Sequence, residues 1–221
     1  MNTSPMKDKV VLITGAGKGA GRALAQAFVT EGALVAANDI SPVNLDSLVQ
    51  AGVGRIRAYA EDIAKKVGVQ AVINQVEDDW GRIDVLVNHA AAEPNTSVLE
   101  MDEWDWHRVL DVNLTGAFLT MQSVGRVMKQ AGAGVMFNLV GLVERPQRRG
   151  AAYTASMYGL IALTRAAADE LAPYGISVHA LGTGIQRFHA AAEDVPLDLI
   201  GAALYLCQSK LNGQIVNLED R

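Results

Sequence analysis

Residues 10–21 read VVLITGAGKGAG, a short aliphatic run that leads directly into a glycine-rich turn. Val10 to Thr14 have the continuous apolar character of a strand that is buried on both faces. The glycines that follow allow a tight turn and a close approach of the backbone to a ligand, and a helical pattern begins directly behind them. A strand, a glycine-rich turn and a helix in this order predict a phosphate-binding turn.

Aliphatic runs and helical patterns alternate in the same way to the end of the chain. This alternation predicts an α/β fold: a Rossmann-type, doubly wound parallel sheet of about seven strands with helices on both faces, in a single domain over residues 1–221. The expected strands are Val10–Thr14, Leu34–Asn38, Arg55–Ala60, Ile83–Asn88, Val135–Val140, Ile176–Leu181 and Gln214–Leu218. The expected helices are Ala20–Glu31, Pro42–Gln50, Ala64–Trp80, Met101–Gln130, Ala151–Ala172 and Pro196–Gln208.

The composition excludes several classes of protein. With 50% hydrophobic residues and a net charge of −5, the 221-residue chain is not intrinsically disordered. The excess of 24 acidic over 19 basic residues argues against a nucleic-acid partner. No apolar run is long enough to span a membrane, and the single cysteine, Cys207, cannot form an internal disulfide. We therefore expect a soluble, cytoplasmic protein in which Cys207 is a small core residue and not a nucleophile.

An acidic residue strengthens the interpretation of the glycine-rich turn. Asp39 ends the second expected strand, twenty residues beyond Gly19, where a carboxylate accepts hydrogen bonds from the ribose of a bound adenosine. The alternative is a glycine-rich turn that serves helix packing alone. The position of Asp39 favours nucleotide binding over this alternative. The candidate cofactor-binding residues of this half are Gly15, Gly17, Lys18, Gly19, Ala20, Gly21, Asp39 and Ile40.

Further motifs make the chain resemble the short-chain dehydrogenase/reductase family over nearly its whole length. The glycine motif of that family matches residues 14–21, and its adenine-contacting pair resembles Asp62-Ile63. Its Asn-Asn-Ala-Gly motif resembles residues 88–91, and its helix with an active-site Asn matches residues 111–116. The resemblance implies a nicotinamide dinucleotide that lies extended across the carboxyl edge of the strands. It adds Asn88, Ala90, Tyr153, Gly184 and Ile185 to the candidate cofactor contacts.

The choice between the two dinucleotides depends on two side chains. The Asp39 carboxylate would repel a 2′-phosphate and favours NAD(H). Lys18 stands where some NADP-using relatives carry a basic residue, although it can equally be a solvated lysine. We therefore expect NAD(H), with NADP(H) less favoured.

The resemblance implies a catalytic set of Ser, Tyr, Lys and Asn, and only part of it is present. Tyr153 and Asn113 match the Tyr and the Asn. Met157 stands four residues after Tyr153, where relatives carry the Lys that lowers the pKa of the Tyr and binds the nicotinamide ribose. The Ser that orients the carbonyl would fall on Val140 or Gly141, depending on where a one-residue gap is placed. The catalytic motif is therefore degenerate.

The missing groups affect the two directions of the reaction differently. An unperturbed tyrosine has a pKa of about 10, so only about one in a thousand is ionised at pH 7. Alcohol oxidation needs the Tyr as a base and should be strongly impaired, whereas carbonyl reduction needs the neutral phenol. Three functions stay open: a weak carbonyl reductase that acts on a small carbonyl or alcohol through Tyr153, a non-catalytic NAD(H)-binding protein that serves as a redox sensor or structural partner, and a scaffold whose cofactor site is vestigial.

The remaining expectations concern the substrate side and assembly. Pro196 follows Ile185 by eleven positions, so the insertion with which relatives cover the substrate is predicted to be mostly absent after Ile185. His89 is either a replacement proton donor or a polar loop residue. Three arginines, Arg145, Arg148 and Arg149, either bind an anionic substrate or are solvated.

By resemblance we expect a homodimer or homotetramer formed through helices 101–130 and 151–172 and through the last helix and strand.

Overall fold

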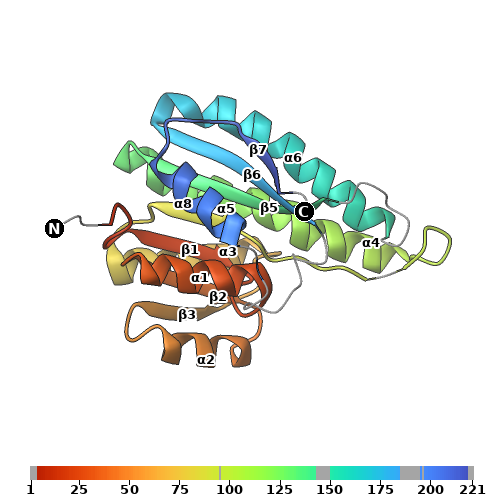
Figure 1. The fold of residues 1–221 in the computed structure, drawn as a ribbon. Helices are drawn as coiled ribbons and strands as arrows, with labels where there is room; N and C mark the ends of the chain where they lie inside the picture. Colours follow the sequence, from red (N-terminus) through yellow and green to blue (C-terminus); the bar gives the residue numbers. More distant parts are fainter. Residues whose placement is uncertain (1–3, 95, 143–149, 185–194, 196, 219–221) are drawn as a thin grey trace.

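The expected sheet is present in the computed structural model, which describes residues 4–94, 96–142, 150–184, 195 and 197–218. All seven strands are parallel and follow the order β3-β2-β1-β4-β5-β6-β7, so the chain reverses its direction of winding between β1 and β4. Helices cover both faces in one domain (Figure 1). The strands are β1 Val10–Thr14, β2 Leu34–Asp39, β3 Ile56–Ala60, β4 Val85–Asn88, β5 Gly134–Leu142, β6 Ile176–Gly184 and β7 Ile215–Leu218.

Each face of the sheet has its own group of helices. One core cluster joins the sheet to α1, α2 and α8, and a second joins it to α3, α5 and α6. The helices are α1 Gly19–Thr30, α2 Val43–Ala51, α3 Lys66–Trp80, α4 Glu103–Leu110, α5 Gly116–Ala131, α6 Ala151–Leu171 and α8 Leu197–Gln208, with a π-helical turn η1 at Asp111–Thr115 and a 3₁₀ turn η2 at Ala172–Tyr174.

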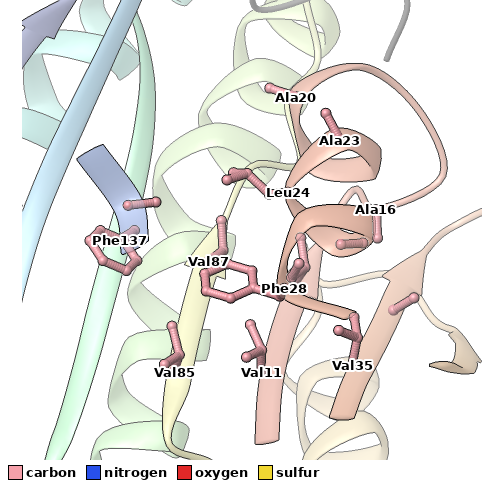
Figure 2. Close-up of a cluster of buried hydrophobic side chains, with 14 of the residues drawn as sticks. Val11, Ala16, Ala20, Ala23, Leu24, Phe28, Val35, Val85, Val87 and Phe137 are labelled. Carbon is pink, nitrogen blue, oxygen red and sulfur yellow. The ribbon is translucent and has the colours of Figure 1, made fainter. Parts of the chain in front are cut away.

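Helix α1 shows how the first strand–helix unit is held together. Its residues Leu24 and Phe28 are fully buried and lie over the sheet, close to Val11, Val87 and Phe137 (Figure 2). Burial of a side chain of this size contributes about 1.5–3 kcal/mol relative to its exposure. The same helix begins at the glycine-rich turn, so this packing fixes the turn against the end of β1.

The expected helix Met101–Gln130 is wrong as a single helix. Asp102 caps α4 by accepting a hydrogen bond from the backbone N–H of Asp105, so the helix begins at Glu103. The chain then passes through η1, where the N–H of Gly116 donates to the carbonyl of Asp111. This extra residue per turn is a π-bulge, a feature that occurs often at functional sites. It contains Asn113.

Candidate nucleotide-binding site

The glycine-rich turn has a shape that only glycine allows at several positions. Gly15 and Gly19 have φ angles of +65° and +57°, in the left-handed region. A Cβ on Gly17 would lie 2.4 Å from the Cβ of Asn44 and 2.7 Å from Oδ2 of Asp39. The turn therefore lies directly against the end of β2 and the start of α2.

Asp39, the last residue of β2, connects these elements. Its Oδ2 accepts a hydrogen bond of 3.1 Å from the N–H of Gly17, and its Oδ1 accepts one of 3.0 Å from the N–H of Ser41. The side chain is only 6% exposed. A carboxylate has further lone pairs, so Asp39 can still accept hydrogen bonds from a ligand.

A cleft of about 240 Å³ opens at the carboxyl ends of β1, β2, β3 and β4. It lies where the direction of winding reverses, the usual place for a ligand in an open α/β sheet. Many residues singled out from the sequence meet here. The described lining consists of Gly15, Lys18, Gly19, Asn38, Asp39, Ile40, Asn44, Glu61, Asp62, Ile63, His89, Ala90, Ala91, Ala92, Arg108 and Val112.

One end of the cleft is formed by the N-terminus of α1. No side chain caps this helix, and its first turn has no acidic residue. Its free N–H groups and its dipole therefore favour an anion. Lys18, the residue before the first helical position, lines the cleft and is exposed.

The opposite end combines apolar surface with charged groups. Ile40 is 59% exposed at the rim, whereas Ile63 is buried. Oδ1 of Asp62 accepts a hydrogen bond from the N–H of Ala64, and its Oδ2 lies 3.7 Å from Nη1 of Arg108. The two isoleucines can contact a flat base.

Arg108 and Glu61 are lining residues that the sequence reasoning missed. Arg108 is on α4, far from the glycine motif in the sequence, and only the fold brings it to the cleft. Glu61 directly precedes Asp62, so its place after the third expected strand is the one signal that could have indicated it.

Asn113, on η1, is buried and makes three side-chain hydrogen bonds. Its Oδ1 accepts from the N–H of Ala92 at 2.7 Å, and its Nδ2 donates to the carbonyl of Ala92 and to Oγ of Ser156, each at 3.0 Å. The Ser156 hydroxyl donates to the carbonyl of Tyr153. Asn113 therefore fastens the loop after β4 to α6.

Tyr153 lies in an apolar cluster and not in the cleft lining. It is 1% exposed, and Met157, one helical turn later, is 2% exposed. Both pack with Val140, which is fully buried on β5. In the part of the chain that the structure describes, an apolar side chain thus occupies the position of the Lys, directly beside the Tyr.

Asn88 serves the interior of the fold. Its Nδ2 donates to Oδ1 of Asn138 at 2.9 Å, and its Oδ1 accepts from Thr120 at 2.6 Å. Nδ2 of Asn138 donates in turn to Thr164 on α6. This buried network joins β4 and β5 to α5 and α6, so the side chain of Asn88 does not line the cleft.

His89 packs against the glycine-rich turn. Its Nδ1 lies 3.0 Å from the carbonyl of Gly15, which can only accept, so Nδ1 carries the proton. A Cβ on Gly21 would come within 2.5 Å of the same nitrogen. This placement favours a structural role for His89 over that of a proton donor.

Several expectations fall on residues beyond those described. Gly184 is the last residue of β6, and Ile185 lies outside the described residues, as do Arg145, Arg148 and Arg149 and the segment of the shortened lid. Burial raises the pKa of Cys207 to about 12, which agrees with an unreactive packing residue. Among the described residues no cluster suited to a metal ion is found, and no helix is long and apolar enough to cross a membrane.

Comparison with known proteins identifies the family. A family model described as short chain dehydrogenase matches residues 9–195. The chain belongs to the short-chain dehydrogenase family. The 3-oxoacyl-(acyl-carrier-protein) reductase FabG of Thermotoga maritima is 37% identical over 185 residues, which cover 81% of this chain and 74% of that protein.

Solved structures of short-chain dehydrogenases have the same fold. A short chain dehydrogenase from Mycobacterium smegmatis superposes with a TM-score of 0.88 at 32% identity, covering 99% of this chain and 94% of that one. The 3-ketoacyl-(acyl-carrier-protein) reductase from Brucella melitensis, solved in complex with NADH, has a TM-score of 0.86 at 26% identity, covering 96% of this chain and 97% of that one. Proteins of this family are oxidoreductases that bind a nicotinamide dinucleotide.

Proposed function

We propose that this member of the short-chain dehydrogenase family binds NAD(H) and is strongly impaired in hydride transfer, most of all in the oxidation of an alcohol. One observation carries the proposal: Met157 is buried against Tyr153, where relatives place the Lys. A thioether cannot stabilise a tyrosinate or donate a hydrogen bond to a ribose. Binding is retained because the glycine-rich turn and Asp39 form an intact cleft.

Asp39 supports NAD(H) over NADP(H). Its carboxylate lines the cleft at the end of β2, and Glu61 and Asp62 add negative charge nearby. A 2′-phosphate next to Asp39 would be repelled in this partly buried position. Lys18 stands at the other end, by the start of α1, where it suits the pyrophosphate that both dinucleotides carry.

The remaining catalytic groups support only slow chemistry. A bound nicotinamide would supply or accept the hydride, and Tyr153 is the one acid of the family's set that the sequence retains. Val140 and Gly141 have no hydroxyl to donate to a developing oxyanion, and the loss of one such donor costs a factor of about 10²–10³ in rate. Asn113 is committed to Ala92 and Ser156.

Slow carbonyl reduction is the second candidate function. Retention of Tyr153 and Asn113 at the family positions favours it, because a neutral phenol can still protonate a carbonyl oxygen. A lid shortened after Ile185, as the sequence predicts, would weaken selection of a substrate. We also propose the homodimer or homotetramer that the resemblance implies.

A binding titration followed by an activity screen tests the proposal. NADH is titrated into the protein, and carbonyl compounds are then screened for loss of dihydronicotinamide absorbance. We expect saturable binding of NADH, weaker binding of NADPH and little or no turnover. Absence of NADH binding contradicts the proposal, and turnover at the rate of an ordinary family member contradicts the impairment.

Restoration of the missing groups gives the matched test. Met157→Lys is combined with Val140→Ser in one variant and with Gly141→Ser in another. Turnover should rise above that of the wild type in at least one of them. No rise in either folded variant means that these positions are not the decisive deficit.

A further inference from the structure

We infer that Arg22 is a positioning residue of the nucleotide site, which turns the carbonyl of Gly17 away from the cleft and so leaves N–H groups of the glycine-rich turn to face an anion. Arg22 is half-buried near the start of α1 and is not among the described residues that line the cleft. The inference rests on the proposed binding of NAD(H), and it assigns part of that affinity to a side chain outside the cleft.

The guanidinium of Arg22 joins the glycine-rich turn to α2. Its Nη1 donates to the carbonyl oxygens of Gly17 and Asn44, each at 3.4 Å, and its Nη2 donates to Oγ of Ser47 at 3.0 Å. Asn44 and Ser47 both belong to α2. A planar guanidinium carries its five N–H donors in a fixed fork, so one side chain can reach acceptors on two elements at once. Arg22 thus sets the position of the turn relative to α2.

Gly17 is held on both sides. Its N–H donates to Oδ2 of Asp39, and its carbonyl accepts from Arg22. This carbonyl and the N–H of Lys18 belong to one trans peptide, in which the two groups point in opposite directions. Because the carbonyl is turned to Arg22, the N–H of Lys18 points the other way, and Lys18 lines the cleft. A carbonyl in the place of this N–H would repel a phosphate.

A second carbonyl of the turn is engaged in a similar way. The carbonyl oxygen of Gly15 lies 3.0 Å from Nδ1 of His89, which carries the proton. The carbonyl of Gly17 differs because its partner, Arg22, is always charged. This charge also favours an anion near the start of α1, where the helix dipole acts in the same sense. The two effects can be separated, since positioning requires the fork of the guanidinium and the charge alone does not.

Titration with NADH separates positioning from charge. We expect Arg22→Gln, which removes the charge and most of the donors, to raise the Kd of NADH about tenfold. Arg22→Lys keeps the charge but loses the fork, so its Kd should rise by nearly as much. Wild-type affinity in Arg22→Lys overturns the inference, because the charge alone would then suffice. Arg165→Gln is the charge-matched control, at an exposed position of α6 that is not in the described cleft lining, and it should leave the Kd unchanged.

Ser47 provides a readout that a merely stabilising role of Arg22 would not move. Ser47 is exposed on α2, is not in the described cleft lining, and contacts Arg22 through its hydroxyl. Ser47→Ala should raise the Kd of NADH about threefold in the wild type and should have no further effect in Arg22→Gln. Equal effects in the two backgrounds overturn the inference. Gln50→Ala, also at an exposed position of α2, is the control and should not change the Kd.

Thermal denaturation without ligand separates a loss of binding from a loss of folding. If Arg22→Gln is unfolded at the temperature of the titration, Ser47→Ala decides, and a Kd equal to that of the wild type then overturns the inference. Wild-type affinity in folded Arg22→Gln overturns the inference as well but leaves the proposed function intact. If the wild type itself does not bind NADH, both fail.

Discussion

At the scale of single residues, Asn113 illustrates how a residue of the family's catalytic set also supports the fold. It is 1% exposed and bonds both the N–H and the carbonyl of Ala92, as a neighbouring strand would. The resemblance identifies Asn113 as an active-site residue. The structure adds that this side chain holds the loop between β4 and α4, the loop that borders the cleft.

Replacement of Asn113 by Ala should destabilise the protein. The change leaves the N–H and the carbonyl of the half-buried Ala92 without this partner. An unsatisfied backbone group costs about 1–3 kcal/mol when it is buried. We expect a loss of about 2–4 kcal/mol in the free energy of unfolding, measured by urea denaturation. Asn74→Ala is the matched control, because Asn74 is exposed on α3 and bonds only Gln70 there. Equal losses in the two variants would contradict this role.

His179 makes the stability of the protein depend on pH. It is fully buried on β6 and stacks on Phe137, and neither of its ring nitrogens has a hydrogen-bond partner among the described residues. Burial lowers its pKa to about 4. Below pH about 6.5 the unfolded chain binds a proton that the folded protein refuses, so stability falls as the pH drops from about 6.5 to about 4.

The size of this effect can be measured against a variant without the imidazole. The shift corresponds to at most about 3 kcal/mol, complete near pH 4. Urea denaturation at several pH values should show this decrease in the wild type and a smaller one in His179→Leu. If the two proteins lose the same stability between pH 6.5 and 4, His179 is not its source.

At the scale of elements, two glycines should respond in opposite ways to the same substitution. A Cβ on Gly17 would collide with Asn44 and Asp39, which would force the turn away from β2 and α2. A Cβ on Gly201, in α8, would meet no atom within 4 Å. Gly17→Ala should therefore abolish NADH binding, whereas Gly201→Ala should raise the free energy of unfolding by about 0.5–1 kcal/mol through helix propensity.

Fluorescence titration with NADH and thermal denaturation check this pair. The Gly17→Ala variant tests the packing of the turn against β2, because the added Cβ would collide with Asp39. Retention of full NADH affinity in Gly17→Ala would mean that the turn and β2 can separate without loss. A lower melting temperature in Gly201→Ala would show that α8 has a constraint at this position.

The elements were predictable to different degrees. All seven strands were located from the sequence. A strand such as Val10–Thr14 is the easiest to predict, because both of its faces are buried and its residues are almost all apolar. The break at Asp111 was missed because residues 101–130 carry helical character throughout, and a π-bulge leaves no clear signal in such a pattern. Asp102 as a helix cap was the one available sign of the later start.

The site was predictable where motifs describe local chemistry. Asp39 and the glycines lie in the cleft because a strand end and the next turn determine their place. Arg108 was missed because its approach to Asp62 depends on how α4 crosses from a distant part of the chain. Motifs also could not reveal that the amide of Asn88 is used by Asn138 and Thr120, since a buried network is a property of packing.

At the scale of the whole molecule, the cleft and the α5–α6 face are separate surfaces. The described nucleotide half has the glycine-rich turn, the Asp39 carboxylate and the N-terminus of α1, and Met157 stands at the position where the family resemblance places a Lys. The α5–α6 face keeps exposed apolar side chains that the interior does not need. Phe118 is 43% exposed and Tyr174 is 39% exposed. Exposed apolar side chains on this face make it the candidate surface for the proposed assembly.

The α5–α6 face should form the contact between two copies of the chain. A groove of about 320 Å³ lies there, lined in part by Phe118, Met121, Leu163 and Tyr174. We expect sedimentation to show a dimer or tetramer, and Phe118→Glu to convert a dimer to a monomer or a tetramer to a dimer, because a charge at an apolar contact would be buried unpaired. Val67→Glu is the control: Val67 is 76% exposed on α3, so the assembly should persist. A monomeric wild type, or equal dissociation in both variants, would remove this face as the contact.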